Sequence, residues 1–381
     1  MRGIAIAIGA VCVLGVAAAW FALGARGAHP RNGPLVVTKG GSAPGRFVRG
    51  DGLFDGKGGR AALAVAVSGA MMGPLSPVAV AGPDGTVAYN SWSAPRLVDS
   101  SRSFSAQGIR NGDVLGVPSI RTRDDAGHDV LLARGAYSAA WRSDGAIAFV
   151  SAVEPAFRAG QAYNGQVVVR DGVHGRDVVW ASEPAHYVVY RWAGRRLLFY
   201  RVGLGEKLEL LVADAPGQVR PLAEGSAIAI SPDGMRVAVV SEDGTTVRVL
   251  DIASGREVAW LDVTTASTPM RWISYSGSWV GEHIVAPSSS GLAVLHAGDD
   301  SLTLEQSLSL DHSQFPIGVQ EPRFTETDGN EIAAVADVPP AAGAQGTSTL
   351  LQCDRVARTC DRGPSAPAND WLRPVDDEGG R

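Results

Sequence analysis

Lysine is scarce in this 381-residue sequence, and no run of basic residues occurs in it. Only Lys39, Lys57 and Lys207 are lysines among the 34 basic residues, so the other 31 are arginines, and these are scattered. The formal net charge is −5. Because contacts with a phosphate backbone need clustered lysine and arginine side chains, we exclude nucleic acid as a partner.

Motifs that carry known catalytic chemistry are also missing. The seven histidines form no HxH, HExxH or HxxxH pair, the spacings typical of metalloenzymes. The sequence has no GxSxG turn, no SxxK pair and no phosphate-binding loop. It therefore assigns no catalytic, cofactor-binding or metal-binding residue, and it predicts that the chain is not an enzyme.

One long hydrophobic run is present, at the N-terminus. Residues 3–25 contain no charged side chain, and a helix of that length covers about 34 Å, enough to cross a hydrocarbon core of about 30 Å. We predict a signal anchor over residues 1–25, with residues 4–25 spanning the membrane. Cleavage after Gly24 is the alternative, which would leave a secreted protein.

The next segment, residues 26–59, is rich in Gly, Pro and Arg and is predicted to be a tether. A folded domain is predicted over residues 60–375, with a tail at 376–381. The domain is expected outside the cytoplasm, although the basic residues that flank the hydrophobic run point the other way, because long domains translocate largely regardless of charge.

Beyond residue 75 no sustained helical period occurs; short apolar runs alternate with Gly, Asp, Asn and Pro turns instead, which predicts an all-β fold. The clearest unit, residues 227–261, reads as four strands. The same order of strands and turns recurs in six copies, at 78–134, 137–181, 187–224, 227–261, 271–310 and 322–363. Their first-turn glycines are spaced about 49 residues apart on average, which is typical of propeller blades.

The repeat predicts a six-bladed β-propeller, with seven blades as the less favoured count and residues 60–67 as an additional strand that helps to close the ring. Such sheets cannot bury both of their apolar faces alone, so they stack around an axis. The stretch SPDGMRVAVV, followed by VRVLDIASG and REVAWL, resembles a blade of the TolB-like and WD-repeat-like propellers. The resemblance covers about residues 76–363 and implies an extracytoplasmic, non-enzymatic domain that binds proteins. With the anchor and the excess of arginine, it indicates a membrane-anchored protein from a GC-rich, actinobacterial-type bacterium.

Only three cysteines occur, and Cys12 belongs to the hydrophobic run. In the sixth copy Cys353 closes the third strand and Cys360 opens the fourth, across the hairpin 354–359. Residues that face each other in adjacent strands are close enough for a bridge. We predict a disulfide between Cys353 and Cys360, which favours an oxidising compartment.

Two clusters allow a functional interpretation. Asp124, Asp125, His128 and Asp129 could supply metal ligands, but they fall where the other copies have a hairpin, which favours a solvated turn. Seven tryptophans mostly recur at strand positions, which favours packing between blades over a ligand cage; they are Trp92, Trp141, Trp180, Trp192, Trp260, Trp272 and Trp279.

The predicted function is a protein-binding or scaffolding ectodomain whose partner is another envelope or secreted protein. Its binding surface is expected on the extended connections at 93–116, 152–164 and 337–347. The alternative is a propeller hydrolase or lactonase with a metal in the central channel, for which Glu154 and Asn164 are candidates that no spacing selects.

Overall fold

The computed structural model describes residues 32–38, 46–49, 52–55, 79–82, 86–97, 114–124, 128–152, 165–202, 207–265, 270–274, 276–311, 314–315, 319–325, 328–338, 347–367 and 373–374. Among these residues no helix is long and apolar enough to cross a membrane. The predicted anchor at 1–25, the predicted closing strand at 60–67 and the tail at 376–381 lie outside the described residues.

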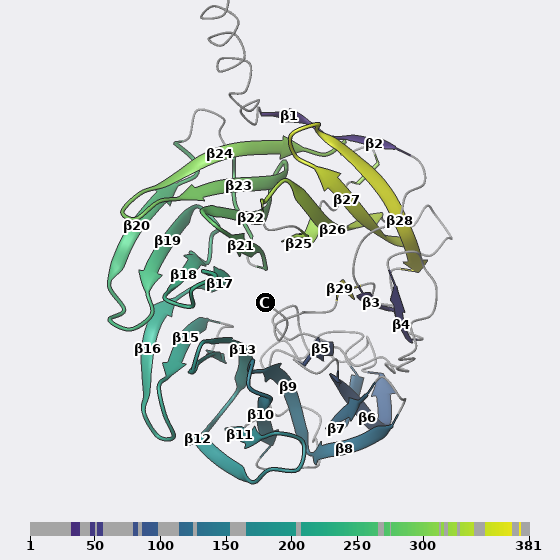
Figure 1. Ribbon diagram of the computed structural model, residues 1–381, viewed down its shortest axis with the longest axis vertical. Coiled ribbons are helices and arrows are strands. Elements are labelled where there is room, and N and C mark those ends of the chain that lie inside the picture. Colours follow the sequence, from purple (N-terminus) through teal and green to yellow (C-terminus); the bar gives the residue numbers. More distant parts are fainter. Residues whose placement is uncertain are drawn as a thin grey trace, which may run out of the picture.

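The strands of the described residues form seven sheets, which are arranged around a common centre in Figure 1. Six of the sheets each contain four strands that are consecutive in the sequence and antiparallel to one another. The strands β5 to β16 are Ala79–Ala81, Val87–Leu97, Val114–Arg123, Asp129–Arg134, Ala136–Trp141, Ala146–Ala152, Gly165–Asp171, Asp177–Ala185, Tyr187–Ala193, Arg196–Val202, Leu208–Ala213 and Val219–Glu224. The strands β17 to β28 are Ser226–Ile230, Arg236–Val240, Thr246–Asp251, Glu257–Asp262, Ser278–Val280, His283–Ser288, Gly291–Ala297, Leu302–Ser309, Val319–Phe324, Glu331–Val338, Thr347–Asp354 and Thr359–Pro367.

This arrangement is a β-propeller. The four strands predicted over residues 227–261 are β17 to β20, and each of the other five copies likewise forms one sheet. In every sheet of four, the first strand lies toward the centre in Figure 1 and the fourth strand forms the outer rim. The predicted all-β class and the propeller architecture are therefore confirmed.

Both ends of the chain contribute strands that the repeat did not predict. β1 (Gly33–Pro34) and β2 (Val36–Thr38) pair in parallel with β24 and β28, on the rim of two neighbouring sheets. β3 (Arg46–Arg49), β4 (Gly52–Asp55) and β29 (Arg373–Pro374) form a seventh, three-stranded sheet. The segment 26–59, predicted to be a tether, thus supplies four strands, of which β1 and β2 add to open edges of existing sheets.

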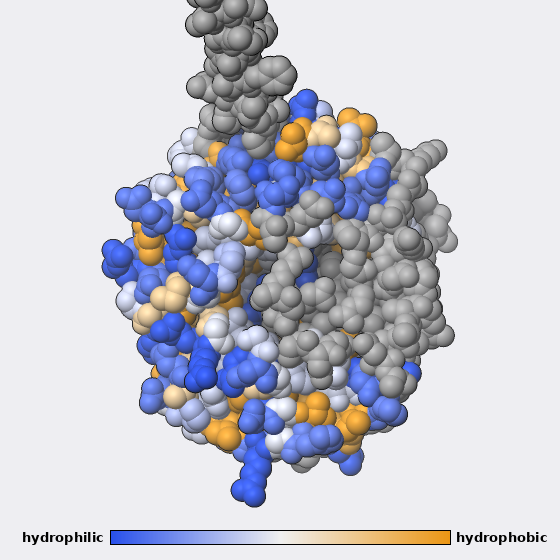
Figure 2. Space-filling view, in the orientation of Figure 1, coloured by the Kyte–Doolittle hydropathy of each residue, from blue (hydrophilic) through white to orange (hydrophobic). Residues whose placement is uncertain are grey.

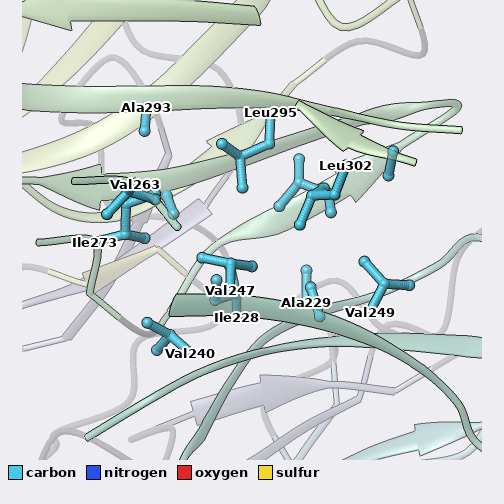
Figure 3. Packing of buried hydrophobic residues seen from close by; sticks show 14 of the residues in the cluster. Ile228, Ala229, Val240, Val247, Val249, Val263, Ile273, Ala293, Leu295 and Leu302 are labelled. Carbon is cyan, nitrogen blue, oxygen red and sulfur yellow. The ribbon is translucent and has the colours of Figure 1, made fainter. Parts of the chain in front are cut away.

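The core lies between successive sheets. Buried aliphatic side chains from β17–β20 meet those from β21–β24 in one cluster, shown in Figure 3, where Val247 and Val249 face Leu295 and Leu302 across the gap. Equivalent clusters lie between the other successive pairs of four-stranded sheets, from β5–β8 through β25–β28. Each sheet therefore buries both of its faces only when its neighbours are present.

The first hairpins explain the recurring glycines. All five predicted turn glycines that the structure describes have positive φ, between 54° and 89°; they are Gly145, Gly194, Gly234, Gly281 and Gly329. At Gly234, with φ at 68°, a Cβ atom would also lie 3.1 Å from the backbone nitrogen of Gly194 in the neighbouring sheet. Glycine is thus required at Gly234 by its conformation and by the close approach of the next sheet.

Candidate functional site

The extended connections predicted to bind a partner lie largely outside the described residues, which omit 98–113, 153–164 and 339–346. The candidate calcium ligands Glu154 and Asn164 fall in the same gaps. The features that the structure does place are a hairpin of carboxylates, a set of tryptophans, a disulfide, an N-terminal strand pair and a partly buried ionic cluster.

The carboxylates near residue 128 are held by neighbouring residues. The backbone N–H and the Nδ1 of His128 both bond to Asp124, at 2.8 Å each. Asp129 accepts hydrogen bonds from Arg121 Nε at 2.8 Å and from the Tyr89 hydroxyl at 2.7 Å. Burial, with the hydrogen bond to Asp129, raises the pKa of Tyr89 to about 12. Asp125 is not described, and no group of three or more His, Cys, Asp or Glu side chains in the described residues could hold a metal ion.

The tryptophans separate into two groups. Trp180 and Trp192, from neighbouring sheets, pack edge to face with ring centroids 5.4 Å apart, and the guanidinium of Arg142 lies 4.8 Å from the Trp192 ring. Trp141 and Trp279 are also buried. Trp260 and Trp272 instead are 60% and 42% exposed. Packing between sheets thus accounts for the buried group, as predicted, but not for Trp260 or Trp272.

The predicted pair of cysteines forms a disulfide in this structure. Cys353, in β27, faces Cys360, in β28, and their sulfurs are bonded. Both residues are fully buried in the apolar cluster between β21–β24 and β25–β28. The bridge therefore cross-links the two strands of the last hairpin within the core.

The N-terminal strand pair, residues 33–38, lies directly over this hairpin; we call it the strap. The N–H of Leu35 donates to Ser309 O at 2.7 Å, and the N–H of Val36 donates to Arg358 O at 2.9 Å. Val37 is the partner of Cys360 in the parallel pairing. The Leu35 side chain is 4% exposed and packs in the same apolar cluster as the disulfide. The strap consequently joins the rims of two neighbouring sheets.

A partly buried ionic cluster, in which only Arg355 is fully buried, lies at the same junction. Glu305, in β24, receives hydrogen bonds from His283 Nδ1 at 2.7 Å and from Arg355 Nη1 at 2.9 Å. Arg355 belongs to the hairpin that the disulfide closes, and its side chain is only 3% exposed. Its backbone carbonyl also accepts a hydrogen bond from Gln306 Nε2 at 3.0 Å. Side chains of β24 thus hold the last hairpin of the ring by charge and by hydrogen bonds.

Glu305 departs from the repeat at a defined position. In five outer strands, one residue has no partner in the preceding strand, because the register shifts there. Such an extra residue forms a β-bulge. Four of these residues are apolar, namely Leu132, Trp180, Leu222 and Val258, whereas the fifth is Glu305. Sequence reasoning missed this cluster. The available signal was a single glutamate where four aligned copies have an apolar side chain.

The pKa of Glu305 reflects two opposed effects. Burial raises it, but the hydrogen bonds and charges of His283 and Arg355 outweigh burial and lower the pKa to about 2 from an ordinary value of 4.5. The carboxylate therefore stays ionised in the folded protein at any pH near neutrality.

This shift predicts a loss of stability in acid. A carboxylate whose pKa is lower in the folded state stabilises the fold above its unfolded pKa, and this contribution is lost as the pH falls through the folded value. We expect Glu305 to contribute fully above pH 4.5 and to lose its contribution between pH 4.5 and about 2. The upper limit of this contribution to the free energy of unfolding is about 3 kcal/mol. Screening by solvent reduces the contribution, because Glu305 is partly exposed.

The measurement is chemical denaturation of the wild type and of Glu305→Gln at several pH values from 7 to 3. Because other carboxylates titrate in both proteins, only the difference between the two curves reports on Glu305. A difference that stays constant over this range would contradict the assigned pairing.

The comparisons with known proteins bear on the fold alone. No family model matches the chain, and no curated protein matches its sequence. The solved structures that it is similar to include β-propeller domains, and the similarity is distant. TolB from Acinetobacter baumannii is 16% identical with a TM-score of 0.39, over 68% of this chain and 61% of that one. The chain thus spans about three fifths of TolB.

The other similarities are equally distant. The propeller domain of Cps50 (Swd1) from Myceliophteria thermophila is 11% identical with a TM-score of 0.43, over 82% of this chain and 92% of that one. A Bacteroides fragilis protein that is described as a 6-phosphogluconolactonase is 14% identical with a TM-score of 0.42, over 88% of this chain and 96% of that one. The expected resemblance to TolB and WD-repeat propellers is therefore confirmed as a distant likeness of fold, and these similarities carry no argument about activity.

Proposed function

We propose that the protein is a non-enzymatic, extracytoplasmic scaffold that binds another envelope or secreted protein and is tethered to the membrane by residues 4–25. One observation carries the binding function. The rim of the propeller already holds an extended polypeptide segment, because the strap adds as a parallel strand to β24 and β28 and buries Leu35 there. An open strand edge offers main-chain hydrogen bonds to any extended segment of suitable shape.

The proposed compartment is supported by the disulfide. Disulfides persist in oxidising environments outside the cytosol, and Cys353–Cys360 is fully buried where it supports the last hairpin. We also propose that the ring consists of six four-stranded blades and that the seventh sheet, formed by β3, β4 and β29, closes the ring.

The compartment is tested by protease treatment of intact cells or spheroplasts. We expect the propeller to be cleaved or released before the membrane is lysed, because the tether is exposed outside. A cytoplasmic protein of known location serves as the control for lysis. Protection of the propeller until detergent is added would place it in the cytoplasm and contradict the proposal.

The scaffold is distinguished from a metal-dependent hydrolase by chelation. A metal ion that binds only the folded state would raise the melting temperature. Because the scaffold is proposed to need no metal, the purified protein is expected to have the same melting temperature, within about 1 °C, with and without EDTA. Metal content is measured on the same samples by mass spectrometry. A drop of several degrees together with the release of a stoichiometric calcium ion would favour the hydrolase alternative.

A further inference from the structure

The outer strands of the ring differ in how readily their edges accept another strand. β24 and β28 are covered by the strap. β16 carries Pro221, which has no N–H to donate, and β20 begins with the charged Glu257. Prolines and charges are the usual protection of an exposed edge against added strands. β8 and β12 also begin with an aspartate, and β12 carries Glu183 and Pro184 near its end, but neither strand has a proline or a charge at the two positions that follow the aspartate.

Those aliphatic residues recur in the same pattern. β8 begins Asp-Val-Leu-Leu and β12 begins Asp-Val-Val-Trp. The second and third residues of each strand are exposed, by 41% at Val130, 48% at Leu131, 45% at Val178 and 41% at Val179. In Figure 2 apolar surface appears along the lower rim, where Figure 1 places β8 and β12.

The charges beside these residues are already neutralised. The acidic residue that opens each strand is paired with an arginine, Arg121 with Asp129 at 2.8 Å and Arg170 with Asp177 at 2.5 Å. The edge thus offers backbone groups and aliphatic side chains that follow aspartates already paired with arginines. A segment that matches it is extended, aliphatic and uncharged.

The relation between β8 and β12 repeats the one between β24 and β28. In each case the two strands form the rim of successive sheets. A hydrogen bond also crosses each junction, from Arg170 Nη1 in β11 to Leu132 O in β8 at 2.6 Å and from Gln306 Nε2 in β24 to Arg355 O in the last hairpin at 3.0 Å. The strap, with the sequence Gly-Pro-Leu-Val-Val-Thr, shows which segment such a pair of rims accepts.

We propose that the outer edges of β8 and β12 bind an extended, aliphatic, uncharged segment of a partner protein as an added strand, in the way that β24 and β28 bind the strap. The inference rests on the proposed scaffold function and names its binding surface and the chemistry of its partner. A different protein is the expected source, because the strap of a second copy is already engaged in its own ring.

The test uses a synthetic peptide with the sequence of residues 32–38, in which a photo-reactive leucine replaces Leu35. It is added at millimolar concentration to the full-length protein in detergent, since short peptides bind weakly, and the labelled residues are mapped by mass spectrometry. We expect labelling of residues 129–134 and 177–185. The double substitution Leu131→Lys/Val179→Lys should reduce this labelling at least fivefold, because charged side chains protect a strand edge against an added strand.

The matched control is Trp260→Lys, which places the same charge at an exposed position on the rim strand β20. This variant should be labelled like the wild type, and thermal unfolding checks that all variants are folded. Labelling confined to residues 302–309 and 359–367, or no labelling above that of an unrelated charged peptide, would overturn the proposal.

A second measurement separates this proposal from the scaffold function. The wild type and the Leu131→Lys/Val179→Lys variant are each isolated from native membranes, and the partners they retain are compared. Specific partners kept by both proteins would overturn the binding surface and leave the scaffold function standing. Self-association of the wild type that the double variant loses, measured by sedimentation, would replace the different partner with a second copy and overturn the proposal as stated.

Discussion

Replacing Glu305 with alanine is expected to lower the free energy of unfolding by about 3 kcal/mol. The reason is the partner that remains: Arg355, only 3% exposed, would keep its charge without the carboxylate that accepts its hydrogen bond. Removing one member of a buried ion pair costs more than the pair contributes, because the desolvated charge is left uncompensated. Chemical denaturation measures the loss, and hydrogen exchange should place the first opening in β27 and β28.

A double substitution provides the control. The bulge position of Glu305 holds leucine in two other outer strands, at Leu132 and Leu222, so an apolar side chain suits this site. Glu305→Leu combined with Arg355→Met removes both charges and keeps the volume, and we expect it to recover most of the lost stability. If the double variant is as unstable as the sum of its single variants, the two residues are not coupled, and the assigned cluster is wrong.

Replacing both Cys353 and Cys360 with serine is expected to lower the free energy of unfolding by about 4.5 kcal/mol. The cross-link closes a short loop, which contributes about 2.5 kcal/mol in the chain-entropy description. Two hydroxyls would also be buried in the apolar cluster, at a cost of about 1 kcal/mol or more each. Denaturation of the wild type and the variant measures the change.

Cys353→Ala with Cys360→Ala separates the two contributions, because alanine removes the cross-link without adding a hydroxyl. The free energy of unfolding of this alanine variant should lie between those of the wild type and the serine variant. Mass spectrometry without reductant, on protein taken from its native compartment, should find the two cysteines linked to each other. Two thiols that react with an alkylating reagent there would contradict both the bridge and the argument for export.

The recurring turns and strands were sufficient to predict the sheets, because their causes are local. Ser231-Pro232-Asp233-Gly234 encodes its own turn: the Asp233 carboxylate accepts from Ser231 Oγ and from the Met235 N–H, and Gly234 takes the positive φ. The same reasoning predicted the facing cysteines, since two strands joined by a short hairpin have a determined register.

The strap and the ionic cluster could not be predicted in this way. Pairing of Val37 with Cys360 joins residues more than 300 positions apart, and nothing local in a Gly/Pro-rich segment indicates which edge it joins. Glu305 reads in the sequence as a solvent-exposed strand residue. Only the assembled sheets show that Arg355 from the neighbouring sheet and His283 from the same sheet both contact it.

The sequence by itself determined the class of fold, the order of strands in each sheet, the turn glycines and the pair of cysteines, because hydrophobic alternation and turn chemistry act over a few residues. The tertiary structure alone decided how the sheets meet: which rims are covered by the strap, which have no added strand among the described residues, as at β8 and β12, and which charges lie at a junction. These depend on contacts between segments distant in the chain, whose energies come from packing and desolvation after the sheets have assembled.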